Sequence, residues 1–181
     1  MAPDRDLRFE LTPGELREVA RFVLASAEPL LPVFEDACPE DPRPRAALDA
    51  ARVFADGAPR GRLQRVASMD AHRAAAAAPS EPARLAAQAA GDAASAAYLH
   101  PIARAHQVGH ILRASANAAR IAELASGDDP LAGQAAVDAA AARATPVLVD
   151  VLRRYPAAPP GRSRVAELMV VLDAALRERA R

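Results

Sequence analysis

Apolar side chains recur at intervals of three and four residues along most of the chain, which is the period of an α-helix. The first start signal is Thr12-Pro13-Gly14-Glu15, a capping box with proline at the first helical position. Later prolines and glycines separate one periodic stretch from the next. The pattern predicts a helix that starts at Pro13 with a kink near Ala27, and further helices from Asp41 to Gly57, from about Arg62 to Ala78, from Pro79 to Leu99, from about Ile102 to Ser126, from Pro130 to Thr145, from Val147 to Tyr155 and from Val165 to Leu176.

No stretch shows the alternation of apolar and polar residues that is typical of a β-strand. Hydrophobic residues make up 51% of the 181-residue chain, most of them alanine, whereas aromatic residues make up only 3%. Alanine favours helices, and its small side chain lets helix backbones pack closely. We therefore predict an all-α fold, with residues 1–181 forming a single compact domain of about seven to eight alanine-rich helices packed as a bundle, with few wide apolar pockets.

The formal charges cancel, with 23 basic and 23 acidic residues, and every basic residue is an arginine. A balanced chain is not typical of a nucleic-acid-binding protein, so we expect no nucleic-acid partner. A local excess of arginine occurs near the C-terminus, and we interpret it as a solvated helix face. Its members are Arg153, Arg154, Arg162, Arg164, Arg177, Arg179 and Arg181.

Cysteine content and hydropathy indicate a cytoplasmic protein. Cys38 is the only cysteine, so neither an intrachain disulfide nor a cysteine-based zinc site can form. The N-terminal residues carry acids and lack the apolar core of a signal peptide. The longest uncharged stretch, residues 93–103, is far shorter than the roughly 20 residues of a membrane span. We expect no membrane partner and no cofactor.

Polar residues line one side of two otherwise apolar helices. When the residues of the helix expected from Ile102 to Ser126 are placed at 100° intervals, its polar residues fall within an arc of about 80°. That stripe contains His106, His110, Arg113, Asn117 and Arg120, and the stripe of the preceding helix contains Arg84, Gln88, Asp92 and Ser95. Asp70 lies on an apolar helix face with Leu63, Val66, Ala67 and Ala74. We expect these polar groups to form a seam if the stripes face one another.

Three interpretations of the stripes stay open. A polar stripe on an amphipathic helix usually faces water. Alternatively, the stripes form a buried structural network in which Asp70 or Asp92 satisfies a histidine or an arginine. In the third interpretation the stripes form a ligand or metal site, because His106 and His110 have the i, i+4 spacing that directs two imidazoles at one ion and Asp92 could add an oxygen ligand.

The remaining histidines have simpler explanations. His72 falls on the opposite side of its helix from Asp70, so we expect it to be exposed. His100 precedes Pro101 at a helix junction, where a capping hydrogen bond is its expected role. No nucleophile elbow, cysteine–histidine pair or glycine-rich phosphate loop is present, so we assign no catalytic residues. The candidate binding residues are His106, His110, Arg113, Asn117, Arg84, Asp92, Asp70 and His100.

Four segments resemble one bacterial family, the Imm-5-like immunity proteins. They are residues 27–36, 39–52, 71–75 and 89–101, with the Asp41-Pro42-Arg43-Pro44-Arg45 turn and the Ala89-Ala90-Gly91 segment as the most specific parts. The resemblance is best over residues 10–125, and the C-terminal helices of residues 130–181 follow Gly127, with a linker at 156–161. The chain departs from the family at Asp92, where many relatives carry a histidine, so no histidine-based site is carried over.

The resemblance implies a protein that binds and neutralises a partner toxin. Some members from high-GC genomes carry the name of an exonuclease subunit, but this chain has no lysine and no loop that could cradle ATP phosphates. Three hypotheses follow: a non-catalytic immunity-type protein, a metal-dependent helical-bundle enzyme that uses His106, His110 and Asp92, and a structural homo-oligomer that pairs alanine faces.

Overall fold

The computed structural model describes residues 7–179 and confirms the all-α fold. Its helical elements are α1 (Pro13–Ala27), η2 (Glu28–Leu30), α2 (Leu31–Ala37), α3 (Arg43–Ala55), α4 (Arg62–Ala77), α5 (Glu81–Ser95), η3 (Ala96–Tyr98), η4 (Ala105–Val108), α6 (Gly109–Ala125), α7 (Pro130–Arg143), α8 (Pro146–Arg153) and α9 (Arg164–Glu178). None of the helices within residues 7–179 combines the length and the apolar character that a membrane span requires.

Local sequence signals set most helix ends. The predicted capping box starts α1: the Glu15 N–H donates to Thr12 Oγ1 at 3.2 Å, and the Thr12 N–H donates to Glu15 Oε2 at 2.8 Å. The predicted interruption near Ala27 takes the form of the short 3₁₀ element η2, which contains Pro29. Gly57 ends the α3 region with a φ of 122°, a left-handed backbone conformation that glycine adopts without strain.

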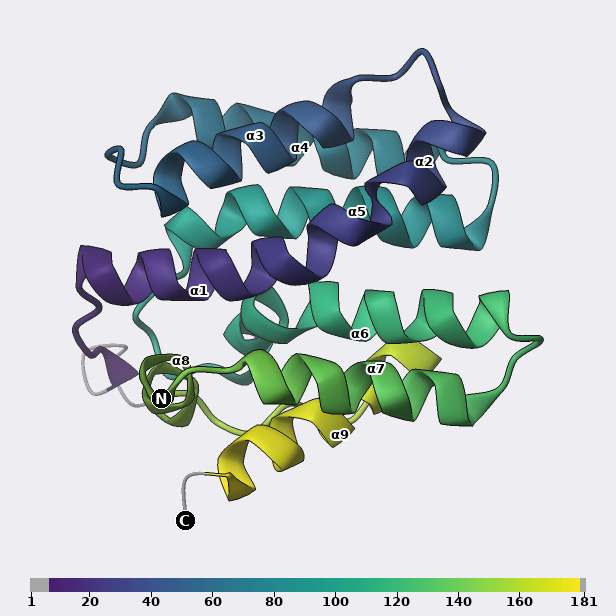
Figure 1. The fold of residues 1–181 in the computed structure, drawn as a ribbon. Coiled ribbons are helices and arrows are strands. Elements are labelled where there is room, and N and C mark those ends of the chain that lie inside the picture. Colours follow the sequence, from purple (N-terminus) through teal and green to yellow (C-terminus); the bar gives the residue numbers. More distant parts are fainter. Residues whose placement is uncertain (1–6, 180–181) are drawn as a thin grey trace.

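Helices α5 and α6 form the centre of the bundle (Figure 1). α5 packs against α1, α2, α3, α4 and α6, and α6 packs against α1, α5, α7 and α9. In Figure 1, α3 and α4 lie at one side of this central pair and α7 and α9 at the other, while α8 is seen end-on beside α1. The two helices that carry the predicted polar stripes are therefore the most enclosed helices of the fold.

Alanine makes this enclosure possible. Seven alanines of α5 are at most 2% exposed, and they lie around most of its circumference. Larger apolar residues fill the core elsewhere, among them Phe34 of α2, Leu112 of α6 and Leu152 of α8, each fully buried. A methyl side chain occupies little volume, so neighbouring backbones can approach α5 from several sides.

The expected start of the helix at Ile102 is wrong. Ile102 instead forms an antiparallel bridge with Arg8, the Phe9 N–H donates to Pro101 O at 3.1 Å, and the Ala103 N–H donates to Leu7 O at 2.8 Å. This pairing holds the segment after Pro101 in an extended conformation, and regular α-helix begins only at Gly109. The N-terminal segment lies about a hundred residues away in sequence, so helical periodicity could not reveal it.

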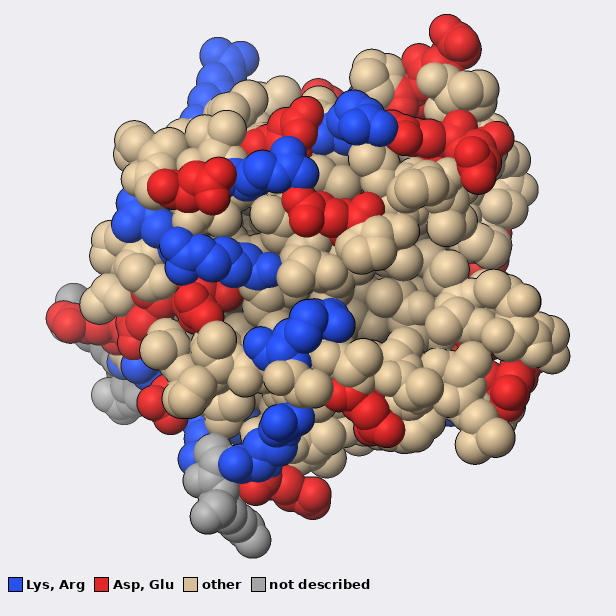
Figure 2. All heavy atoms as spheres, viewed as in Figure 1, with Lys and Arg blue, Asp and Glu red and all other residues tan. Residues whose placement is uncertain are grey.

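Three of the C-terminal arginines bind carboxylates instead of forming a solvated face: Arg154, Arg164 and Arg177. Arg153, Arg162 and Arg179 are exposed, and Arg181 lies outside the described residues. Glu123 of α6 is 1% exposed and accepts hydrogen bonds from Arg164 Nη2 of α9 at 2.7 Å and from Arg120 Nη1 at 3.1 Å. Arg177 binds the buried Asp173 at 2.9 Å, and Arg154 binds Glu15 of α1. On the face shown in Figure 2, acidic and arginine side chains interleave instead of forming a patch of one sign. The pair of Arg164 with Glu123 attaches α9 to α6, and the pair of Arg154 with Glu15 attaches the end of α8 to α1.

Candidate functional site

A buried ion pair joins the two central helices. Asp92 of α5 is fully buried, and both of its carboxylate oxygens accept hydrogen bonds from the Arg113 guanidinium of α6: Nε donates to Oδ2 at 2.8 Å, and Nη2 donates to Oδ1. The Arg113 side chain is 31% exposed, so the pair spans the distance from the interior to the surface. A carboxylate at this depth requires such a bidentate partner. The hydrogen bond to Asp92 raises the pKa of Arg113, which stays charged.

Two histidines flank this pair. His72 of α4 places its Nε2 atom 3.6 Å from Asp92 Oδ1, and His110 of α6 places its Nδ1 atom 3.5 Å from the hydroxyl of Ser95. Burial lowers the pKa of both rings, and the nearby Asp92 carboxylate offsets only part of that effect. Both imidazoles are therefore mainly neutral at pH 7, where they can donate or accept a hydrogen bond without adding charge.

Gly91 creates the space that the His72 ring occupies. A Cβ atom at position 91 would lie 2.8 Å from His72 Nε2 and 2.9 Å from Cε1. On the same side, the Ser68 hydroxyl of α4 donates to the Gly91 carbonyl at 2.9 Å. The glycine thus marks the place where α4 and α5 approach each other closely, because any side chain there would displace the ring.

A second polar group lies further along the same two helices. Asn117 is fully buried, and its side-chain amide donates to the Leu85 carbonyl and to Gln88 Oε1, both at 3.0 Å. Its Oδ1 atom is buried and has no hydrogen-bond partner among the described residues. The amide fixes the rotation of α6 against α5, since its two donors meet two acceptors on α5.

The structure thus brings together some of the polar residues that were expected to form a seam. Asp92, Arg113, Asn117 and His110 lie between α5 and α6, which matches the interpretation of a buried or half-buried network rather than a solvated stripe. Asp92 and Arg113 saturate each other's main hydrogen-bonding groups, and the arrangement therefore orients helices and leaves little capacity to bind a ligand.

The predicted pairing of His106 with His110 does not occur. His106 belongs to the 3₁₀ element η4, is exposed, and lies 2.8 Å from the Gln107 amide through its Nε2 atom. His110 belongs to α6, so the two residues are not one turn apart on a continuous α-helix. Within residues 7–179, no group of three or more histidine, cysteine, aspartate and glutamate side chains is arranged to hold a metal ion. A site built from His106, His110 and Asp92 is therefore not formed.

The other candidates lie outside the seam. Asp70 lines a hollow between α3 and α4 and pairs with Arg73 of its own helix at 2.7 Å. Arg84 is exposed near the start of α5, beside a groove of about 220 Å³ that Gln88 and Arg113 also line. The hydrogen bonds of His100 at this helix junction come from its main chain. The His100 N–H donates to Gln107 Oε1 at 3.3 Å, and the His100 carbonyl accepts from the Tyr155 hydroxyl at 2.9 Å.

The inward face of α4 differs from the predicted one, and this explains why His72 was assigned to the surface. Ala67, Ala71 and Ala74 are buried against α5, whereas Leu63 and Val66 are 56% and 42% exposed. The small residues face inward because they allow a shorter distance between the helix axes than leucine and valine would. The sequence did contain one sign of this close contact, which is Gly91 inside the strongly helical segment of α5. Glycine in a helix costs up to about 1 kcal/mol, so its presence there indicates close packing by a neighbouring element.

Fold and seam together define an all-helical scaffold in which a buried ion pair orients the two central helices. The chain belongs to the family described as "Imm-5 like putative immunity protein", whose family model matches residues 10–145. The match extends past residue 125 to the end of α7. Searches of curated proteins and of solved structures found no match.

Proposed function

We propose that this protein acts without catalysis, by binding a toxin protein and covering the site through which that toxin acts. Membership of the immunity family supports the general kind of function. The observation that carries the proposal is an exposed apolar strip on α4, formed by Leu63, Val66 and Met69, which are 56%, 42% and 50% exposed. Apolar residues in a contiguous exposed strip are typical of a protein-binding surface.

The neighbouring helix widens this α4 strip. Together, α3 and α4 line a hollow of about 250 Å³ that contains Ala46 of α3 as well as Leu63 and Val66. Val53 lies two turns after Ala46 on the same face of α3 and is 46% exposed. The α4 strip is therefore continuous with apolar surface of the adjacent helix.

Charged residues surround the hollow. Asp70 and Arg43 are among its lining residues, and each already pairs with a neighbour of opposite charge, Arg73 and Asp41. An apolar centre with a charged rim is the usual composition of a protein–protein interface. The partner that fits best presents an apolar side chain to the hollow and both an acidic and a basic group to its rim.

A binding measurement with matched variants tests the proposal. Proteins encoded beside this gene are first screened by pull-down for one that the wild type binds. The affinity of that protein is then measured by calorimetry for the wild type, Leu63→Glu, Val66→Glu and Leu131→Glu. Leu131 of α7 is 75% exposed and lies outside the α4 strip, which makes it the control. We expect the first two changes to weaken binding at least about tenfold, as hot-spot changes do, and the third to have no effect.

Two results would count against this assignment. Unchanged affinity of Leu63→Glu and Val66→Glu would remove the α4 strip from the interface. Light scattering that shows a wild-type dimer, converted to a monomer by Leu63→Glu, would instead make the strip a contact between copies of this chain, as the homo-oligomer hypothesis requires.

A further inference from the structure

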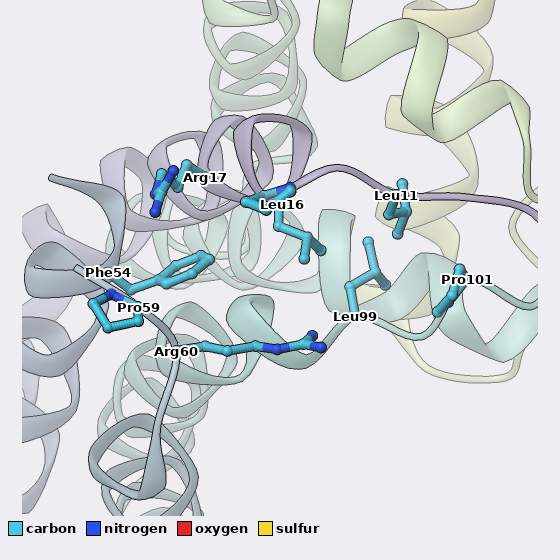
Figure 3. Close-up of a pocket in the computed structure, with 9 residues that line it drawn as sticks. Leu11, Leu16, Arg17, Phe54, Pro59, Arg60, Leu99 and Pro101 are labelled. Carbon is cyan, nitrogen blue, oxygen red and sulfur yellow. The ribbon is translucent and has the colours of Figure 1, made fainter. Parts of the chain in front are cut away.

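A cavity of about 340 Å³ lies on a different part of the molecule, between the start of α1, the end of α3 and the segment around Leu99 (Figure 3). Its apolar lining includes Leu11, Leu16, Phe54 and Leu99. The volume is at the lower end of the range of about 300–1,000 Å³ that is typical of small-molecule sites. Because residues far apart in sequence form its walls, helical periodicity gave no sign of it.

Arg17 of α1 forms part of the wall of this cavity. One terminal nitrogen, Nη2, donates to the Gly57 carbonyl at 2.8 Å, and the guanidinium carbon lies 5.7 Å from the centre of the Phe54 ring. The Nε atom is buried and has no acceptor among the described residues. A buried N–H without an acceptor is unfavourable, so this guanidinium retains unused donor capacity.

Arg60 forms the wall opposite. In Figure 3 its side chain extends along the cavity, with the guanidinium end near Leu99. Its contacts are a long hydrogen bond of 3.4 Å from Nη1 to the Ala97 carbonyl and a position 5.7 Å from the Tyr98 ring centre. The guanidinium groups of Arg60 and Arg17 therefore contact backbone carbonyls and aromatic rings, which are uncharged.

Among the described residues, nothing balances the positive charge of this cavity. Within residues 7–179 no acidic residue lines it, and neither Arg17 nor Arg60 forms an ion pair. Unlike Arg17, two other partly enclosed arginines have carboxylate partners, as Arg113 has in Asp92 and Arg164 in Glu123. An apolar cavity with two uncompensated guanidinium groups is complementary to a ligand with an apolar body and a negative charge.

We propose that this cavity binds a small organic acid that carries a carboxylate on a medium-length aliphatic chain. The chain would lie against Leu16, Phe54 and Leu99, and burial of its methylene groups would provide most of the affinity. The carboxylate would accept hydrogen bonds from both Arg17 and Arg60, whose planar guanidinium groups suit carboxylate oxygens. This binding activity is separate from recognition of a toxin at the α4 strip.

Three probes with the same alkyl chain test the proposal. Octanoate, 1-octanol and octylammonium are titrated into the full-length protein, and binding is measured by calorimetry and by ligand-observed NMR. Octanoate should bind saturably and at least about tenfold more tightly than 1-octanol, the difference that one charge-assisted hydrogen bond provides. Octylammonium should not bind, because its charge repels the arginines.

Variants locate the site. Arg60→Met and Arg17→Met should each weaken octanoate binding at least about tenfold while affinity for 1-octanol changes little. Arg162→Met, at an exposed arginine of the segment before α9, is the matched control and should behave as the wild type. Arg60 is exposed and holds no helix end through an ion pair, so its variant remains informative even if Arg17→Met fails to fold.

Three outcomes would overturn the proposal: similar affinity for all three probes, octanoate binding that Arg60→Met leaves unchanged, or no octanoate binding at millimolar concentration. The result does not depend on the toxin, since Leu63→Glu should weaken toxin binding and leave octanoate binding intact. Loss of octanoate binding in Leu63→Glu would contradict the separation of the two surfaces.

Discussion

At the scale of single residues, Gly91 and His72 form a complementary pair on α5 and α4. The imidazole ring occupies the space of the missing side chain, within 3.0 Å of where a Cβ atom would be. The His72 side chain is 36% exposed, so the ring has a route to solvent if that space is filled. Residue 91 therefore determines where His72 lies and which electrostatic environment it experiences.

The change Gly91→Ala should move the His72 ring into solvent. Burial is the main cause that lowers the pKa of His72, so the displaced ring should titrate closer to its ordinary value of 6.5. A proton NMR titration of the four histidines measures this directly. We expect little net change in the free energy of unfolding. Alanine stabilises a helix by about 0.5–1 kcal/mol relative to glycine, and this offsets the loss of the contacts that the His72 ring makes in its present position.

His72→Ala provides the control for this prediction. With the ring absent, Gly91→Ala should stabilise the protein in urea unfolding, since the methyl group then meets no obstacle. If His72 kept the same pKa in the Gly91→Ala variant, the ring would not occupy the space at Gly91.

At the scale of whole elements, Gly133 sets the contact between α7 and α6. A Cβ atom at position 133 would lie 2.2 Å from Glu123 Oε1, and that carboxylate is fixed by Arg120 and Arg164. Unlike the His72 ring, the Glu123 side chain is fully buried and has no route to solvent. The two helices must therefore separate if residue 133 carries a side chain.

Gly133→Ala should consequently destabilise the protein by about 2 kcal/mol or more, the cost of overpacking at a close helix contact. Urea unfolding monitored by circular dichroism at 222 nm measures the loss. Gly109→Ala is the comparison, because a Cβ atom there would meet nothing within 4 Å and should change stability by less than about 0.5 kcal/mol. Equal stability of the two variants would show that α6 and α7 can separate at negligible cost.

Most helices could be predicted from the sequence because their ends carry local signals. Thr12, Ser80, Asp129 and Thr145 each accept a hydrogen bond from the first turn of the following helix, and prolines or glycines lie beside them. The segment from Ile102 to Val108 could not be predicted. Its extended conformation depends on hydrogen bonds to residues 7–9, which are remote in sequence.

At the scale of the whole molecule, the histidines of the seam predict a pH dependence of stability. Burial lowers the pKa of His72 and His110 in the folded protein, so the unfolded chain binds more protons as pH falls below about 6.5. The unfolded state is then favoured. The stabilisation is complete above pH 6.5 and is lost as the pH falls through the lowered pKa values of the folded state.

The free energy of unfolding should therefore decrease between pH 7.5 and pH 5.5. Urea unfolding at several pH values measures the decrease, and the variant His72→Gln/His110→Gln should remove most of it. Carboxylates such as Glu15, whose pKa falls to about 2 beside Arg154, lose their contribution only at lower pH. A decrease that persists in the double variant would have to come from groups outside the seam.

The ion pairs also connect residues inside the range that the family model matches with residues outside it. Glu123 and Arg120 lie within the matched residues 10–145, whereas Arg164 of α9 lies beyond them. A buried carboxylate that loses its cation is strongly unfavourable, so the matched region depends on α9 for the stability of α6. We therefore expect the matched region and α9 to unfold in one cooperative transition.

The sequence by itself determined the helical class, most helix boundaries and the family, because these depend on periodicity, on capping residues and on short motifs that lie within a few residues of one another. The tertiary structure decided which face of α4 points inward, the pairing of Asp92 with Arg113 and the cavity between Arg17 and Arg60. Each of these depends on distances between segments that are remote in the chain. On α4 the more hydrophobic leucine and valine lie outward, so hydrophobicity does not indicate the inward face, and the small size of alanine, which permits close approach, decides it instead.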